Sequence, residues 1–368
     1  MGAKALQDIL GRKILTASYQ KVKSGVPKPL PAAFYAARRG VMGNIVNYVE
    51  DIGSRQVSQT TRYGAKANRI VHTGRGEKPL SMIHSFESWD LNPQQLMYLM
   101  SDQGVEEELG ESEVMRLLQE DKVRSDNLRA TATHMALLLG ELHFDTRELL
   151  PNDTGAVVSI EFGVNATTNK GACQEIDGAT AIFGSWATST TDIQGQLETV
   201  KRTAIQRTGY ALRYAFYGKN VKGYLNKNDT LGNLMNGNSV DAATALRGRL
   251  PEIEDLLWVD VSGVFYDKLN ADGSVTTNEL VPEDTVVFTP DPANVGWWDF
   301  VEGTTIVPGQ TGLISDVNAV IGTMEHARGQ FAYGQGKMNP VTAEIFHGDT
   351  FLPMLLSADA IFIATVQA

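Results

Sequence analysis

Residues 112–147 carry the longest helical pattern in the chain, and this stretch constrains the fold most strongly. Ser112 is a favourable N-cap, and the acidic residues around it lie at the positive end of a helix dipole. Apolar residues recur at helical spacing, namely Val114, Leu117, Leu118, Leu128, Ala132, Met135, Leu139 and Leu142. A helix of this length would measure roughly 50 Å, so the pattern predicts a strut on which other elements pack.

Polar residues interrupt this stripe in its middle, at Asp121, Arg124, Ser125 and Asp126. We therefore expect the middle of the helix to face water or a polar partner. The alternative is two shorter helices with a break near Ser125.

The composition indicates a folded protein of one elaborated domain or two, because 368 residues with 42% hydrophobic content can bury a core. The single cysteine, Cys173, excludes an intramolecular disulfide, and we interpret it as a small buried hydrophobe rather than a nucleophile. No apolar run approaches the ~18 residues of a membrane span, and no signal peptide is apparent. The sequence thus predicts a protein that is made and kept in the cytoplasm.

The charge is distributed unevenly along the chain. The net charge is −11, but residues 1–80 hold 14 Lys or Arg against 4 Asp or Glu, so the remainder is strongly acidic. Such asymmetry indicates a basic segment that contacts something acidic, either nucleic acid or the acidic body of another copy of the chain. A solvated basic surface with no partner is the alternative.

The first eighty residues predict an amphipathic helix, an arm and a projecting hairpin. The helix covers residues 4–21, and the three prolines in residues 26–31 favour an extended arm. Residues 51–80 are basic and glycine-punctuated and have few large aliphatic side chains. They predict a two-stranded hairpin that lies on something else, with a disordered basic loop as the alternative.

Helices and strands alternate after Pro151, which predicts an α/β domain over residues 190–335. Asp192 should cap a helix that buries one apolar face and ends near Gly209. Residues 341–366 predict two further strands.

Catalytic and metal-binding motifs are not found in the sequence. The six histidines are scattered without an HExxH pattern, and no G-x-S-x-G surrounds any serine. Asn339 occupies the place of the third glycine after Gly334 and Gly336, and Lys268 stands where a calcium loop needs its first carboxylate. We therefore expect no catalytic residues, no cofactor and no metal, and the protein is not expected to be an enzyme.

Two segments near the C-terminus resemble the lambda-type major capsid proteins of tailed bacteriophages, the capsid protein E family. They are YDKLNADGSVTTNELVPEDTVVFTPDP and FLPMLLSADAIFIATVQA. In that family a hairpin leads through a proline-containing turn, here residues 281–284, to an apolar strand. The family's chain closes with two strands about an Asp-containing turn, here at Asp359.

The resemblance implies an α+β chain with the HK97-like capsid fold. The expected parts are an N-terminal arm (1–50), an extended β-hairpin loop (51–80), a peripheral domain (81–190) with the spine helix (112–147), an α/β axial domain (191–335) and C-terminal strands that return to the peripheral domain (336–368).

The resemblance also implies a major capsid protein that assembles into hexamers and pentamers of an icosahedral head around double-stranded DNA. Expected partners are other copies of the chain, a scaffolding protein, a portal, a decoration protein and non-specifically held DNA, with no membrane. The scaffolding protein is expected to be separate, because no long leader precedes the arm. The expected location is the virion, with assembly in the host cytoplasm. An encapsulin-like cellular shell and a cytoplasmic α/β enzyme with an unrecognised carboxylate site are the alternatives.

Contacts between subunits are expected where the basic loop meets an acidic surface of a neighbour. The candidates are Arg62, Lys66, Arg69 and Arg75 on the loop, and Glu106, Glu107, Glu108, Glu111 and Glu113 near the start of the spine helix. Some members of the capsid fold family cross-link a loop lysine to a neighbour, and Lys66 would be the candidate, but lambda-type proteins are not expected to do so.

Overall fold

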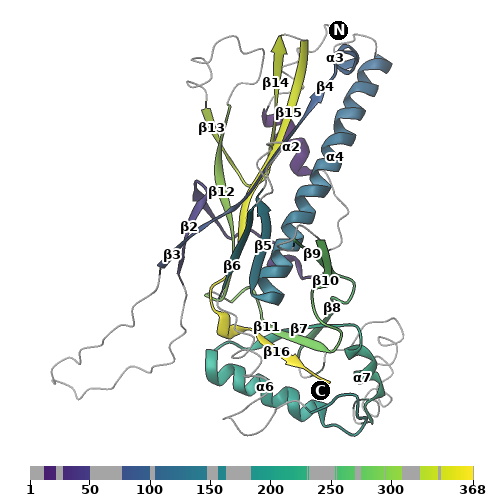
Figure 1. The fold of residues 1–368 in the computed structure, drawn as a ribbon, viewed down its shortest axis with the longest axis vertical. Helices are drawn as coiled ribbons and strands as arrows, with labels where there is room; N and C mark the ends of the chain where they lie inside the picture. Colours follow the sequence, from purple (N-terminus) through teal and green to yellow (C-terminus); the bar gives the residue numbers. More distant parts are fainter. Residues whose placement is uncertain are drawn as a thin grey trace, which may run out of the picture.

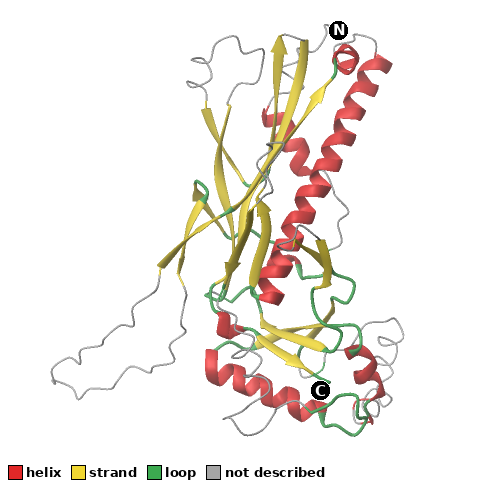
Figure 2. Ribbon diagram, in the orientation of Figure 1, coloured by secondary structure: helices red, strands yellow, loops and turns green. Residues whose placement is uncertain are grey.

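The structure is a computed structural model, and it shows an elongated molecule (Figure 1). It describes residues 12–21, 28–49, 77–99, 104–146, 156–162, 184–229, 231, 253, 255–269, 275–294, 296–308, 324–338 and 341–367. A large sheet and a long helix run along the longest axis, and a smaller sheet with two helices forms one end. Figure 2 shows the same division between helices and strands.

The long helix is continuous, as the sequence predicts, but its bounds differ from 112–147. It comprises α4 (Gly104–His134) and a π-helical turn (Met135–Leu139), so there is no break near Ser125. It begins before Ser112 because glutamates and leucine, which are strong helix formers, fill the preceding turns. It ends at Gly140, whose φ of 71° lies in the left-handed region that glycine adopts without strain.

The residues after Gly140 form a strand instead of the predicted helix end. Strand β5 (Glu141–Thr146) pairs antiparallel with β6 (Ala156–Glu161). The backbone groups of this segment therefore find hydrogen-bond partners in a two-stranded ladder. The apolar residue Leu142 fitted the helical stripe by spacing alone, and its side chain is buried in the strand.

The large sheet is organised around β15 (Val341–Leu355), the longest strand described. One half of β15 pairs with β14 and β4, and its other half pairs with β12, all antiparallel. The other bounds are β1 (Arg39–Met42), β4 (Ile83–Leu91), β12 (Trp298–Pro308), β13 (Met324–Arg328) and β14 (Phe331–Met338). Strand β1 lies parallel to β12, so the two ends of the chain share one sheet.

Alternation along β15 gives this sheet two different faces. Ala343 and Ile345 are buried with Leu118 of α4 and Leu15 of α2 (Arg12–Lys21), whereas Phe346 lies on the opposite face with Phe331 and Tyr333. The helices α2 and α4 therefore cover the first face.

The small sheet has the order β16–β11–β7–β8. Its strands are β7 (Leu212–Tyr217), β8 (Leu257–Asp260), β11 (Thr285–Pro290) and β16 (Phe362–Thr365), and its helices are α6 (Ile193–Thr208) and α7 (Val221–Lys227). The prediction for α6 is confirmed. Asp192 accepts a hydrogen bond from the Gly195 amide at 3.0 Å, and Gly209 ends the helix at φ 82°.

Two strand placements differ from the predicted division of the chain. The last strand, β16, pairs with β11 in the small sheet instead of returning to the long helix, because Phe362 and Ala364 bury their side chains in the core beneath α6. Strands β12 to β14, predicted within the axial α/β domain, belong to the large sheet. The chain therefore crosses from the small sheet to the large sheet after β11 and returns to the small sheet at β16, so the two sheets do not correspond to consecutive segments of the chain.

The predicted hairpin at 51–80 begins earlier than expected. Strands β2 (Ile45–Val49) and β3 (Glu77–Ser81) pair antiparallel, with Val49 opposite Glu77. Residues 50–76, which connect the two strands, lie outside the described part of the chain. A second short hairpin consists of β9 (Phe265–Leu269) and β10 (Val275–Glu279).

The arm segment at 28–35 joins the two sheets. Phe34, fully buried in a 3₁₀ turn (Ala32–Phe34), makes edge contacts with Tyr214 and Phe216 of β7 and with Trp297 and Trp298 at the start of β12. Such contacts add to the burial of apolar area. One side chain from the N-terminal arm thus fills the junction between the large and the small sheet.

Candidate functional site

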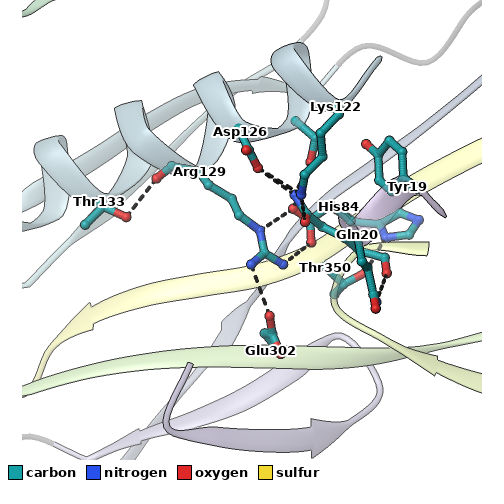
Figure 3. Close-up of polar contacts among 12 residues, drawn as sticks. Tyr19, Gln20, His84, Lys122, Asp126, Arg129, Thr133, Glu302 and Thr350 are labelled. Carbon is teal, nitrogen blue, oxygen red and sulfur yellow. Dashed lines mark hydrogen bonds and ion pairs between the residues drawn. The ribbon is translucent and has the colours of Figure 1, made fainter. Parts of the chain in front are cut away.

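A buried polar cluster lies between the middle of α4 and the large sheet (Figure 3). The helix contributes Asp121, Lys122, Ser125, Asp126 and Arg129, which follow one another at helical spacing. The sequence predicted that this interruption in the apolar stripe would face water or a polar partner. The structure shows a polar partner, supplied mainly by strands β4, β12 and β15.

Arg129 is the centre of the cluster. Its guanidinium donates to both carboxylate oxygens of Asp349, at 2.5 and 2.6 Å, and to Glu302 at 3.0 Å. The cation also lies over the rings of Phe300 and Phe351, 5.6 and 5.2 Å from the centroids. Burial acts to lower the pKa of Arg129, but the hydrogen bonds and charges of Asp349 and Glu302 raise it by more than burial lowers it. The net shift is upward, so the guanidinium stays charged.

A second group of contacts links Lys122 and Gln330. The ammonium of Lys122 lies 3.1 Å from Asp126 and donates to the side-chain oxygen of Gln330. The amide of Gln330 in turn donates to Ser125 at 2.9 Å and to Asp126 at 3.0 Å. Burial lowers the pKa of Lys122, and the Asp126 carboxylate opposes this shift.

His347 forms the third part of the cluster, between the helix and β4. Its Nε2 lies 3.3 Å from Glu87, and its Nδ1 lies 3.3 Å from Asp121, although Nδ1 is not aligned for a hydrogen bond. The indole of Trp89 donates to Asp121 at 2.7 Å. Burial raises the pKa of Asp121, and the nearby His347 and Trp89 oppose this shift.

The chemistry of the cluster is that of a clamp rather than that of a catalytic centre. Its carboxylates at positions 302, 349, 126 and 121 are each already held by a cation, an imidazole or an indole N–H. Buried charges arranged in this way fix one register of the helix on the sheet, because any other register would leave a charge unpaired. Within the described ranges, no group of three or more His, Cys, Asp or Glu is placed to hold a metal ion.

A cleft of about 600 Å³ opens beside the C-terminal half of α4. Its walls are the arm, the helix and the turn between β8 and β9, with lining residues Lys28, Pro29, Asn127, Ala130, Thr131, His134, Asp260, Ser262, Gly263, Val264 and Phe265. Among the described lining residues Asp260 is the one carboxylate, and it accepts hydrogen bonds from Ser262.

The predicted inter-subunit residues are described only in part. Arg62, Lys66, Arg69 and Arg75 lie outside the described residues, and so do the side chains of Glu106, Glu107, Glu108 and Glu111, whose backbone belongs to α4. Glu113 is half-exposed and accepts hydrogen bonds from Arg116 at 2.8 and 2.9 Å within its own helix. Arg116 lowers the pKa of Glu113.

Sequence reasoning identified Asp121, Ser125 and Asp126 of the polar cluster, but Arg124, which it also named, is exposed. It missed Lys122 and Arg129 on the helix and the whole of the strand side. The missed residues are Glu87, Trp89, Lys122, Arg129, Glu302, Gln330, His347 and Asp349. A usable signal was present, because His347 and Asp349 continue the alternate positions of the strand at which Ala343 and Ile345 are apolar. Arg129 likewise follows Ser125 by one helical turn.

No helix in the described part of the chain is both long and apolar enough to span a membrane. No model of a known protein family matches the chain, and no curated protein is similar to it.

Several solved structures are similar to this chain over nearly its whole length. A phage-related protein from Bordetella bronchiseptica RB50 is 11% identical, with a TM-score of 0.49 over 96% of this chain and 97% of that one. A putative capsid protein of a prophage from E. coli CFT073 is 13% identical, with a TM-score of 0.48 over 95% and 94%. The mature capsid of bacteriophage PhiM1 gives 11% identity and a TM-score of 0.43 over 94% and 89%.

Proposed function

We propose that this chain is the major capsid protein of a tailed bacteriophage and that its role is structural rather than catalytic. The observation that carries the proposal is the arrangement of α4. This long helix is clamped by buried charges onto a sheet whose strands come from both ends of the chain. Of the two C-terminal segments that resemble the capsid protein E family, the first forms the β9–β10 hairpin and β11 of the small sheet. The second runs from the end of β15 in the large sheet to β16 in the small sheet.

A shell subunit needs a rigid body and extensions that reach its neighbours. The buried charge cluster under α4 and the packing of Phe34 between the two sheets supply rigidity, because both join distant parts of the chain through buried contacts. The paired strands β2 and β3 form the base of the segment that we propose to be the extended loop. We propose that this loop lies on a neighbouring copy and that its basic residues at 62, 66, 69 and 75 face the acidic start of the neighbour's α4.

The proposed partners are other copies of the chain, in hexamers and pentamers, together with a scaffolding protein, a portal, a decoration protein and packaged DNA. An acidic body that faces the lumen would repel DNA and keep its packing non-specific, and the basic arm could make limited phosphate contacts. The proposed location is the virion, with assembly in the host cytoplasm.

The test is electron microscopy with sedimentation velocity, on the chain expressed alone and together with its neighbouring genes. The proposal expects closed shells or rings of six subunits in at least one of these conditions. A compact monomer or dimer in both conditions would overturn it. Particles that form in cells without genome-length DNA would instead favour the encapsulin-like shell.

A further inference from the structure

Strand β14 lies at the end of the large sheet, and one of its long sides faces away from β15. Among the described residues β14 pairs with β15 alone. An edge strand of this kind presents a row of backbone N–H and C=O groups to which an extended segment from another molecule can add. Soluble proteins therefore cover or block such edges.

Helix α2 makes, with its side chains, the hydrogen bonds that an added strand would make. The hydroxyl of Thr16 donates to the carbonyl of Ala332 at 2.8 Å and accepts from the amide of the same residue at 3.2 Å. One helical turn later, Gln20 donates to the carbonyl of Gln330 at 3.0 Å. Gln330 directly precedes β14 and lies two residues before Ala332, which is the repeat at which an edge strand presents its outward groups.

The same helix is attached through its neighbouring face. Leu15 and Tyr19 are buried between α4 and the large sheet, and the ammonium of Lys122 lies 5.4 Å from the centre of the Tyr19 ring. The buried side chains at positions 15 and 19 thus hold α2 in place, while the side chains at positions 16 and 20 hydrogen-bond to the backbone at the strand edge. This division indicates that the contact with the edge is a specific feature of the helix.

We propose that α2 guards the edge of β14, and that displacing this contact turns the edge into a binding site for the β14 edge of a second copy. The strand favours such pairing because it contains no proline and a single charged side chain, Lys337, whereas charged residues and proline are what usually block an edge. Two identical antiparallel edges are self-complementary about a two-fold axis, and the second copy is always present at the concentration of the protein itself. The inference does not depend on shell formation.

The test is the double variant Thr16→Val with Gln20→Leu in the full chain. We expect it to associate at roughly tenfold lower concentration than the wild type in sedimentation velocity. We also expect the outward amide of Gly336 to gain protection from hydrogen exchange when the variant associates, because that amide would then pair with the second copy. Thr16→Ser, which keeps the hydroxyl, and Ser18→Ala, on the same helix, are the matched controls and should behave as wild type. Circular dichroism establishes that each variant is folded.

A third substitution identifies the surface through which the double variant associates. The amide of Gly336 points the same way as that of Ala332, because the two are four residues apart in the strand. Gly336→Pro removes only this outward donor, so it should abolish the association. A folded double variant that does not associate, or association that persists with proline at 336, would overturn the proposal. Closed shells are distinguished from strand-paired dimers by electron microscopy and by the sedimentation coefficient, so failure of the capsid proposal would not affect this result.

Discussion

At the scale of single residues, the pair of Arg129 and Asp349 is the contact most sensitive to substitution. Asp349 is fully buried, so Asp349→Ala would leave the guanidinium without its two-point partner. We expect a loss of about 3–5 kcal/mol in the free energy of unfolding, measured by urea denaturation. The double variant Arg129→Met with Asp349→Leu should recover most of this loss, because it leaves no buried charge unpaired at these positions. A single variant as stable as the wild type would contradict the clamp.

His134 gives a pH dependence with a defined sign. Burial lowers its pKa to about 4, and its Nε2 shares a hydrogen bond of 2.7 Å with the hydroxyl of Tyr35. Between pH 6.5 and 4 the unfolded chain binds a proton at this residue and the folded chain does not, so stability falls as the pH is lowered, by up to about 3 kcal/mol.

The measurement for His134 is the difference in stability between the wild type and His134→Gln across this pH range. The buried carboxyls of Asp121 and Asp299, whose pKa values are raised by burial, act in the opposite direction and are present in both proteins. A difference that does not change with pH would exclude His134 as the cause.

At the scale of elements, Phe34 tests whether the arm holds the two sheets together. Phe34→Ala should cost about 3–5 kcal/mol, because the ring fills a junction of four aromatic side chains that cannot close without it. Met42→Ala, at a side chain that is 76% exposed, should change stability by less than about 0.5 kcal/mol. Equal effects of the two variants in thermal unfolding would show that the arm is not part of the core.

The same scale shows how far local sequence determines the fold. Helix α6 was predictable at both ends because its cap, its apolar face and its terminal glycine all lie within one segment. The end of α4 could not be predicted from its own segment, because the residues after Gly140 form a strand only by pairing with β6. The partners of β16 and the strand side of the polar cluster likewise depend on contacts between residues far apart in the chain.

At the scale of the whole molecule, the uneven charge distribution predicts how copies contact one another. Arg62→Glu with Lys66→Glu should prevent shell formation, because four units of charge would change in a loop that we propose to face the neighbour's glutamates. The variant should keep the circular dichroism and unfolding midpoint of the wild type, since surface substitutions away from packed features rarely change stability by more than about 0.5 kcal/mol.

Arg207→Glu with Lys227→Glu is the matched control, because it changes the net charge equally at exposed positions on α6 and α7. If both reversals stop assembly, the total charge of the subunit is responsible. If only the loop reversal does, and Glu106→Lys with Glu107→Lys restores shells, the contact is specific to the loop and to the start of α4. Normal shells from the loop variant would exclude these basic residues from the interface.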